Sequence, residues 1–174
     1  IHICKDLVVS ISGRVDNLSQ IRVKYSQNRS PKASAAILRD AFIALDSKIF
    51  DEIKGDWSLV VWDKRRQVLW IARDKLGLSE IYYTQHGGFL YFSSLLTELI
   101  ALSGRPLQIN HGKVCEVGLA IYNQSRETSF NQYYRLPSAH SLFVRDGAAH
   151  ELAYWTLEDA LDKKQPPRLD PQEA

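Results

Sequence analysis

Two neighbouring segments carry large apolar side chains on both faces of an expected strand, and this feature constrains the fold most. The first segment reads WSLVVW (residues 57–62) and the second reads VLWIA (residues 68–72). The polar residues 63–67 between them predict an antiparallel hairpin. A strand that is apolar on both faces needs a packing layer on each side. The sequence therefore predicts a hairpin at the centre of a layered domain.

Shorter patterns predict the elements around this hairpin. Further strands are expected at residues 7–11, 81–84, 89–92, 141–144 and 150–155. Helices are expected up to residue 25 after a cap at Asn17 or Ser19, at 32–45, at 95–102 after a cap at Ser93 or Ser94, and at 112–122. Because the helices are grouped and do not alternate with the strands, the pattern indicates an α+β domain with sheets inside and helices outside.

Composition limits the class of protein. With 174 residues, 45% of them hydrophobic, the chain can form one globular core, and no segment is apolar for long enough to cross a membrane. The net charge is only +2, and we interpret the basic run at residues 64–66 as a hairpin tip. Neither nucleic acid nor a membrane is an expected partner.

The two cysteines give no indication of chemistry. Cys4 and Cys115 have no spacing typical of a disulfide framework or a zinc site, so we expect no metal and a reducing, cytoplasmic location. Cys4 is interpreted as an inert thiol at a strand edge. Cys115 lies among apolar residues of an expected helix, which predicts a buried packing role.

Two motifs resemble a known family. GDWSLVVWD (residues 55–63) and ARDKLGLSEIYY (residues 72–83) resemble the signature of class II glutamine amidotransferase domains in asparagine synthetases, and later segments follow in the family's order. The resemblance implies a four-layer αββα sandwich of antiparallel sheets, the N-terminal-nucleophile hydrolase fold, with its first strands expected upstream. Departures include Glu80, where the family usually has proline, and Ser138-Ala139, where it usually has proline-glycine.

The resemblance also implies a domain organisation. Residues 1–156 correspond to an N-terminally incomplete glutaminase-type domain. Residues 157–174, which contain three prolines, are expected to be a linker toward an absent ATP-dependent synthetase domain.

The family's glutamine pocket corresponds to residues that have changed. Family members that hydrolyse glutamine begin with a cysteine whose α-amine acts as the base, whereas residue 1 here is Ile1, so no residue is assigned a catalytic role. The family's asparagine-glycine-glutamate motif matches Ser12, Gly13 and Arg14, and its second ammonium-binding carboxylate aligns with Ser34. These four residues form a vestigial glutamine pocket. A guanidinium about 4 Å from the ammonium of glutamine would repel it by about 4 kcal/mol at an effective dielectric near 20.

Other motif residues are assigned structural roles. Arg73 and Asp74 are interpreted as an ion pair at a strand end, and Gly77 as a glycine required by backbone shape. His140 and His150 flank an expected hairpin without a partner spacing typical of a catalytic base, which favours a structural or exposed role.

The leading hypothesis is a degenerate glutaminase-type domain that acts as scaffold or interface. The resemblance implies a parent like the lactam and lasso-peptide macrolactam synthetases, with a C-terminal synthetase domain in cis that uses ATP and Mg²⁺ to adenylate a carboxylate before an amine attacks. A second copy of the chain or a peptide substrate are further expected partners. The alternatives are an active glutamine-hydrolysing asparagine synthetase whose cysteine lies upstream, and a pure interaction module.

Overall fold

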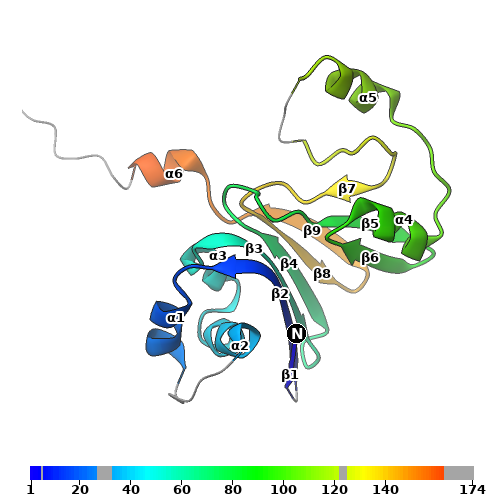
Figure 1. The fold of residues 1–174 in the computed structure, drawn as a ribbon. Coiled ribbons are helices and arrows are strands. Elements are labelled where there is room, and N and C mark those ends of the chain that lie inside the picture. Colours follow the sequence, from blue (N-terminus) through cyan, green and yellow to red (C-terminus); the bar gives the residue numbers. More distant parts are fainter. Residues whose placement is uncertain (5, 27–32, 122–124, 163–174) are drawn as a thin grey trace, which may run out of the picture.

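The computed structural model describes residues 1–4, 6–26, 33–121 and 125–162. Among these residues the strands form a six-stranded and a three-stranded sheet, and every pairing is antiparallel (Figure 1). The large sheet has the order β1 (His2–Cys4), β2 (Leu7–Val15), β3 (Gly55–Asp63), β4 (Val68–Arg73), β8 (His140–Arg145) and β9 (Ala148–Ala153). The small sheet has the order β6 (Phe89–Ser93), β5 (Tyr82–His86) and β7 (Tyr134–Arg135).

The central hairpin predicted from the sequence is confirmed. Strands β3 and β4 pair in register from Ser58↔Arg73 to Asp63↔Val68 in the middle of the large sheet. Leu59 is buried in the core on one face of the sheet, and its neighbour Val60 packs against the cluster on the other face. Alternate side chains of one strand thus enter two different cores, which is why both faces are apolar.

Helices cover one face of the large sheet. They are α1 (Leu18–Tyr25), α2 (Ser34–Leu45) and α3 (Ile49–Glu52), and a 3₁₀ turn (Asp46–Lys48) joins the last two. The stripe of apolar residues predicted on α2 is buried against β2 and β3, with Leu38 and Ala41 fully enclosed. Phe50 on α3 lies 6.5 Å from the Trp57 ring, so aromatic contacts tie this layer to the sheet.

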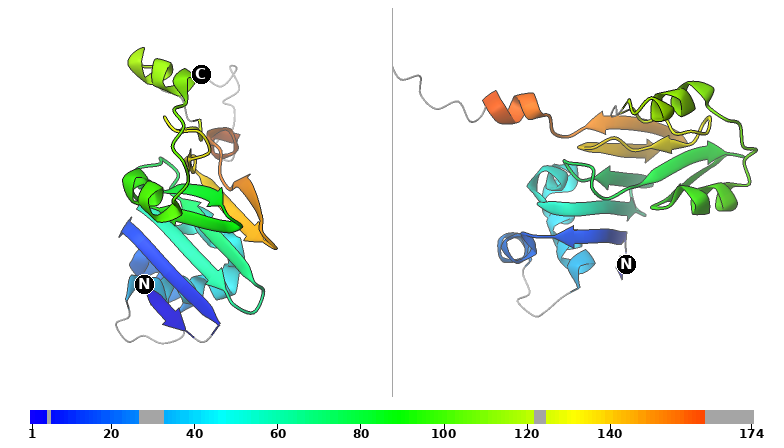
Figure 2. Two further views of the ribbon diagram at one scale, coloured as in Figure 1. Left: turned by 90° about the vertical axis from the view of Figure 1, so that its right-hand side faces the viewer. Right: turned by 45° about the horizontal axis from the view of Figure 1, so that its top comes forward.

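The small sheet packs on the other face and has its own helical cover. Tyr83 of β5 belongs to the core between the two sheets, whereas Tyr82 points the opposite way and borders a cavity beside Leu96 of helix α4 (Leu96–Ser103). The layers are therefore helix, sheet, sheet and helix, and the α+β sandwich of antiparallel sheets is confirmed (Figure 2). Helix α5 (His111–Gly118) extends away from the sheets (Figure 1).

Three local predictions were wrong. Helix α4 takes Leu95 as its N-cap, and the Ser93 hydroxyl accepts from the Leu95 amide outside the helix. Helix α5 ends at Gly118, and the chain beyond it turns through Ala120 at φ 54°. Cys115 is exposed, because Lys113 is the only residue of α5 that is buried and the helix therefore has no apolar layer over most of its surface.

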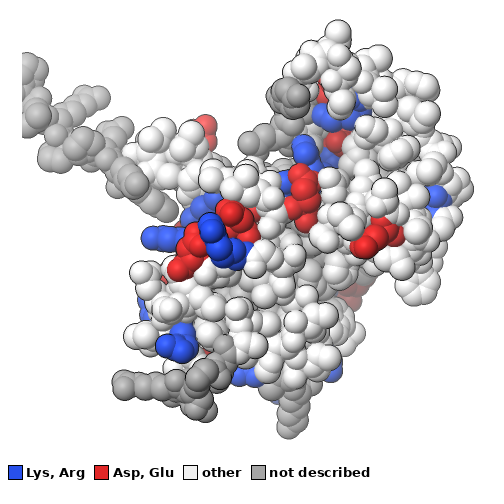
Figure 3. Space-filling model, in the orientation of Figure 1, with Lys and Arg blue, Asp and Glu red and all other residues white. Residues whose placement is uncertain are grey.

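The C-terminal segment is helical where the structure describes it. Helix α6 (Leu157–Asp162) follows β9, and the rest of the expected linker, residues 163–174, lies outside the described residues. Within the described ranges, no helix has the length and apolar content needed to cross a membrane. Acidic and basic side chains lie beside one another on the face in Figure 3, and the basic run 64–66 occupies the β3–β4 turn as predicted.

Candidate functional site

The end of strand β2 carries three of the four residues predicted as a vestigial pocket. Ser12, Gly13 and Arg14 are all exposed. Gly13 has φ +95°, and a Cβ at this position would lie 2.1 Å from the Asp56 carbonyl oxygen and 2.8 Å from the Ser79 hydroxyl. Only glycine fits this close approach without displacing the neighbouring strand. The β2 end is therefore held against β3 and against the loop that contains Ser79.

Arg14 is engaged by neighbouring carboxylates. Its Nε lies 2.8 Å from Asp16 Oδ1, and its Nη2 lies 3.6 Å from Asp56 Oδ2. The side chain is 71% exposed, so water screens both pairs. The positive charge of Arg14 therefore partly neutralises the negative charges of Asp16 and Asp56.

Ser34, the fourth predicted pocket residue, is on helix α2, whereas the other three are on strand β2. It is half-buried at the first position of α2. The hydrogen bonds and ion pairs found in the described part of the chain do not join Ser34 to Ser12 or Arg14.

The loop after β4 is organised around a buried guanidinium. Arg73 is 4% exposed and donates from Nε to the Ser79 carbonyl (2.9 Å) and from Nη1 to the Leu136 carbonyl (2.7 Å). Its Nη2 donates to the Gly77 carbonyl and, at 3.0 Å, to Glu80 Oε1. The described ion pair of Arg73 is thus with Glu80 and not with the expected partner, Asp74. Burial lowers the pKa of Arg73, and the Glu80 carboxylate opposes that shift.

The side-chain carboxylate of Asp74 anchors the same loop by accepting from the loop's backbone amides. It is 1% exposed and accepts hydrogen bonds from the amides of Leu76, Leu78 and Ser79 at 2.9–3.1 Å. A short side chain can reach several amides of the turn that follows it, and this explains its position directly after the strand. Gly77 has φ +68° in this turn, where a Cβ would lie 3.0 Å from the Ser138 Cβ.

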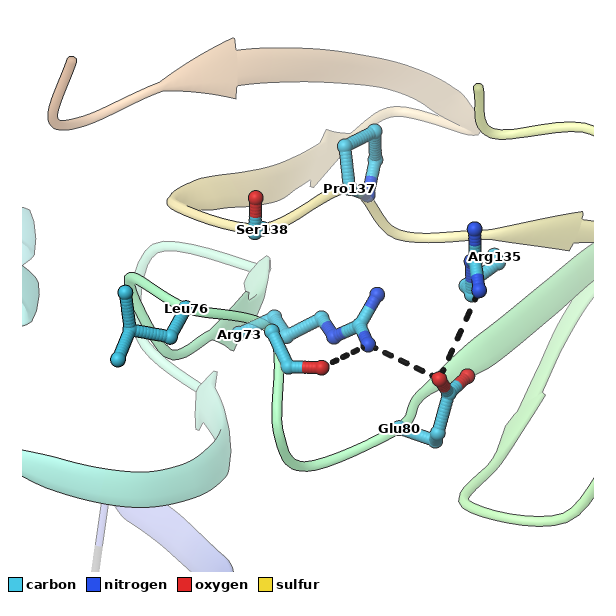
Figure 4. Close-up of a pocket in the computed structure, with 7 residues that line it drawn as sticks. Arg73, Leu76, Glu80, Arg135, Pro137 and Ser138 are labelled. Carbon is cyan, nitrogen blue, oxygen red and sulfur yellow. Dashed lines mark hydrogen bonds and ion pairs between the residues drawn. The ribbon is translucent and has the colours of Figure 1, made fainter. Parts of the chain in front are cut away.

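A polar cavity of about 170 Å³ opens beside this loop (Figure 4). It is lined by Arg73, Leu76, Gly77, Glu80, Arg135, Pro137 and Ser138. Glu80 Oε1 lies between the two guanidinium groups, 3.0 Å from Arg73 Nη2 and 3.7 Å from Arg135 Nη1. The second oxygen, Oε2, is buried and has no hydrogen-bond partner among the described residues. Burial and the Glu80 carboxylate raise the pKa of nearby Tyr82 to about 12.

Sequence reasoning did not predict this cavity. Glu80 and Arg135 are far apart in the chain, and the antiparallel pairing of Tyr82 with Arg135 brings them together. One signal was present in the sequence, because Glu80 stands where the resembled family usually has proline.

The described residues offer no assembled nucleophile at this end of the sheet. The Ser79 hydroxyl lies beside Gly13, and His140, at the start of β8, uses Nδ1 against the Ser138 carbonyl at 2.7 Å. No three His, Cys, Asp or Glu side chains of the described ranges are grouped so as to hold a metal ion. The arrangement can donate hydrogen bonds from backbone and guanidinium groups.

Comparison with known proteins identifies similar domains. The family model described as "Glutamine amidotransferase domain" matches residues 1–155. Asparagine synthetase [glutamine-hydrolyzing] 3 of Bacillus subtilis is 27% identical over 124 residues, which are 70% of this chain and 20% of that protein. Asparagine synthetase [glutamine-hydrolyzing] 2 of the same organism is 23% identical over 163 residues, which are 89% and 22%. The chain thus spans about a fifth of the length of these relatives.

A solved structure shares the fold. Glutamine phosphoribosylpyrophosphate amidotransferase from B. subtilis superimposes with a TM-score of 0.58 at 13% identity, covering 86% of this chain and 29% of that one. At this identity the likeness concerns the fold alone, which is the N-terminal-nucleophile hydrolase sandwich expected from the sequence.

Proposed function

Because this chain belongs to the glutamine amidotransferase domain family, in the form found in asparagine-synthetase-like proteins, we propose that it retains the family's frame without hydrolysing glutamine. The domain serves as scaffold and interface for an ATP-dependent synthetase domain of the same polypeptide. That synthetase domain uses ATP and Mg²⁺ to form an amide, as in lactam or lasso-peptide macrolactam synthesis.

Arg14 is the observation that carries this proposal. It occupies the position of the carboxylate that holds the ammonium group of glutamine in the resembled family. Its guanidinium already pairs with Asp16 and Asp56, so the two nearby carboxylates are not left to bind an incoming ammonium. A cation bound there would meet a like charge, which at 4 Å costs about 4 kcal/mol at an effective dielectric of 20 and less at this exposed position.

The second carboxylate expected in such a pocket is also missing. Ser34 aligns with it and offers a neutral hydroxyl, which binds an ammonium far more weakly than a carboxylate does. Meanwhile Gly13 keeps the backbone conformation that the close approach to Asp56 and Ser79 demands. The backbone conformation is retained while the charges of the pocket are exchanged. This combination favours a domain that is kept as a scaffold and interface and no longer binds glutamine.

Exposed apolar side chains support the interface role. Val114 and Val117 on α5 are 44% and 61% exposed, and Leu119 and Ile121 beyond the helix are 72% and 51% exposed. Apolar groups that gather on one surface commonly mark a contact with another domain. We assign this contact to the synthetase domain in cis, which also explains why α5 lacks a covering layer here.

The experiment measures glutamine binding and hydrolysis separately. The complete polypeptide is incubated with glutamine and assayed for glutamate, and binding to this chain is followed by calorimetry. We expect no glutamate above background and no saturable binding at millimolar glutamine. In Arg14→Glu, which restores an acidic group, binding should become measurable, because reversing the charge changes repulsion into attraction.

Arg65→Glu provides the matched control. Arg65 is exposed in the β3–β4 turn, so its reversal changes the net charge equally without touching the β2 end. Robust glutamate release by the unmodified complete polypeptide would overturn the proposal and favour the alternative of an active glutamine-hydrolysing asparagine synthetase.

A further inference from the structure

We propose that the cavity between Arg73 and Arg135 is a binding site for a small oxyanion, a phosphate or carboxylate group, distinct from the vestigial glutamine pocket. The site lies between the loop after β4 and the segment that follows β7 (Figure 4). This inference does not depend on whether the domain hydrolyses glutamine, because it concerns different side chains.

The charge balance of the cavity favours an anion. Two guanidinium groups border it, and one carboxylate, that of Glu80, stands between them. Both arginines share the same oxygen of Glu80, so the lining carries one more guanidinium than carboxylate in a concave, partly buried space. The nearby Asp74 carboxylate, which also acts on Arg73, is not part of this lining, and its oxygens accept three amides of the loop. Concave sites with an excess of one sign concentrate ions of the opposite sign.

Arg135 is the group available to the ligand. Arg73 is 4% exposed and its guanidinium is committed to three backbone carbonyls and Glu80, so it supplies charge and holds the loop. The Arg135 side chain is 31% exposed, and its described ion pair with Glu80 is long at 3.7 Å. A guanidinium with spare N–H groups binds phosphate or carboxylate in a two-point arrangement.

The size of the cavity suits such a group. Its volume of about 170 Å³ equals that of about six waters at roughly 30 Å³ each, enough for an oxyanion with part of a larger molecule attached. Leu76 and Pro137 supply its apolar boundary, and the remaining lining is polar.

Glu80 acts in this site as an internal competitor. Its carboxylate takes the position between the guanidinium groups that an external anion would favour, and it does so at a position where the resembled family usually has proline. Removing the charge of Glu80 should therefore strengthen anion binding, whereas removing that of Arg135 should weaken it. A change of net charge alone would also give opposite responses to these two substitutions, so an arginine outside the cavity provides the control.

The test follows backbone amides while an anion is added. Sodium phosphate and, separately, sodium acetate are titrated into ¹⁵N-labelled protein at constant pH and ionic strength, and the ¹H–¹⁵N shifts of Gly77 and Ser138 are recorded. We expect saturable shifts. Saturation by phosphate alone assigns a phosphate group, saturation by acetate alone assigns a carboxylate, and saturation by both assigns either group.

Four variants decide whether the site is the one proposed. Relative to the unmodified chain, Arg135→Gln should weaken binding at least about tenfold, and Glu80→Gln should strengthen it by roughly the same factor. Arg135→Lys, which keeps the charge, should lose less than Arg135→Gln. Arg145→Gln removes an exposed arginine outside the cavity and should change the affinity less than about twofold.

Absence of saturable shifts with both anions would overturn the inference. So would an equal response of the Arg135 and Arg145 variants, because it would mean that only net charge matters. The amide spectrum of each variant shows in the same experiment whether the fold is retained.

Discussion

The loop after β4 and the end of β2 lie against each other, yet their polar groups are used in opposite ways. In the loop, Arg73 and Asp74 are buried, and their hydrogen bonds go mainly to backbone carbonyls and amides. At the end of β2, Arg14 pairs on the surface with other exposed side chains. The buried side chains of Arg73 and Asp74 fix the backbone of the loop. The exposed pairs of Arg14 do not fix the backbone of β2, so its side chain can be replaced without changing that backbone.

This difference explains how a domain can keep its fold while its pocket changes. Buried charges that satisfy backbone groups are costly to alter, because each alteration leaves a buried donor or acceptor unpaired. Exposed ion pairs contribute little to stability, so their residues can be exchanged freely. The contrast between loop and strand end can be tested by substitutions on both sides.

Asp74→Ala should have the largest effect on stability. It leaves the amides of Leu76, Leu78 and Ser79 without their acceptor at a partly buried place, and we expect a loss of about 2–4 kcal/mol in the free energy of unfolding. Urea unfolding followed by tryptophan fluorescence measures it. Asp16→Ala, which removes an exposed carboxylate at the β2 end, should cost less than about 1 kcal/mol. Equal losses of unfolding free energy in Asp74→Ala and Asp16→Ala would contradict the difference between the loop and the β2 end.

Gly13→Ala should have an intermediate effect on the free energy of unfolding. It tests the close approach of the Gly13 backbone to β3, the feature of the β2 end that does not depend on exposed side chains. The added Cβ would lie 2.1 Å from the Asp56 carbonyl oxygen, and we expect a loss of about 2–4 kcal/mol. Gly147→Ala is the matched control, because its φ is also positive, at +76°, but no atom lies within 4 Å of the added Cβ. It should cost only about 1 kcal/mol, the strain of the left-handed backbone alone. Thermal unfolding of both variants measures the two losses, and their difference is the cost of the contact between the added Cβ and the Asp56 carbonyl.

Arg14→Ala should have the smallest effect. The side chain is 71% exposed and its pairs with Asp16 and Asp56 are screened, so the free energy of unfolding should change by less than about 0.5 kcal/mol. The same urea titration applies. A loss above about 2 kcal/mol would show that this end of β2 is structural and that Arg14 is retained for folding.

Much of the fold could be predicted because its signals are local. Apolar side chains on both faces of residues 57–62 and 68–72 predicted the central hairpin, and the apolar stripe of α2 predicted a helix packed on the sheet. Cys115 was predicted wrongly because an apolar helix face indicates burial only when another layer covers it, and the chain pattern does not say which faces are covered. The cap of α4 was missed because a serine near a helix start can bond outside the helix as well.

The site was only partly accessible to sequence reasoning. Its motif residues at positions 12–14 and 73–77 were recognised by order and spacing, but the partner of Arg73 was misassigned to its chain neighbour. Asp74 follows the last residue of β4 and its carboxylate accepts amides of the loop, whereas the Arg73 guanidinium meets Glu80.

By itself the sequence determined the family and the central hairpin, and it predicted the exchange of acidic for basic or neutral residues at Arg14 and Ser34, because these depend on residue type and order along the chain. Only the tertiary structure decided that Arg14 is engaged by Asp16 and Asp56, and that Glu80 stands between Arg73 and Arg135. The physical reason is that charge interactions depend on distance in space, and strand pairing sets those distances between residues that lie far apart in the chain.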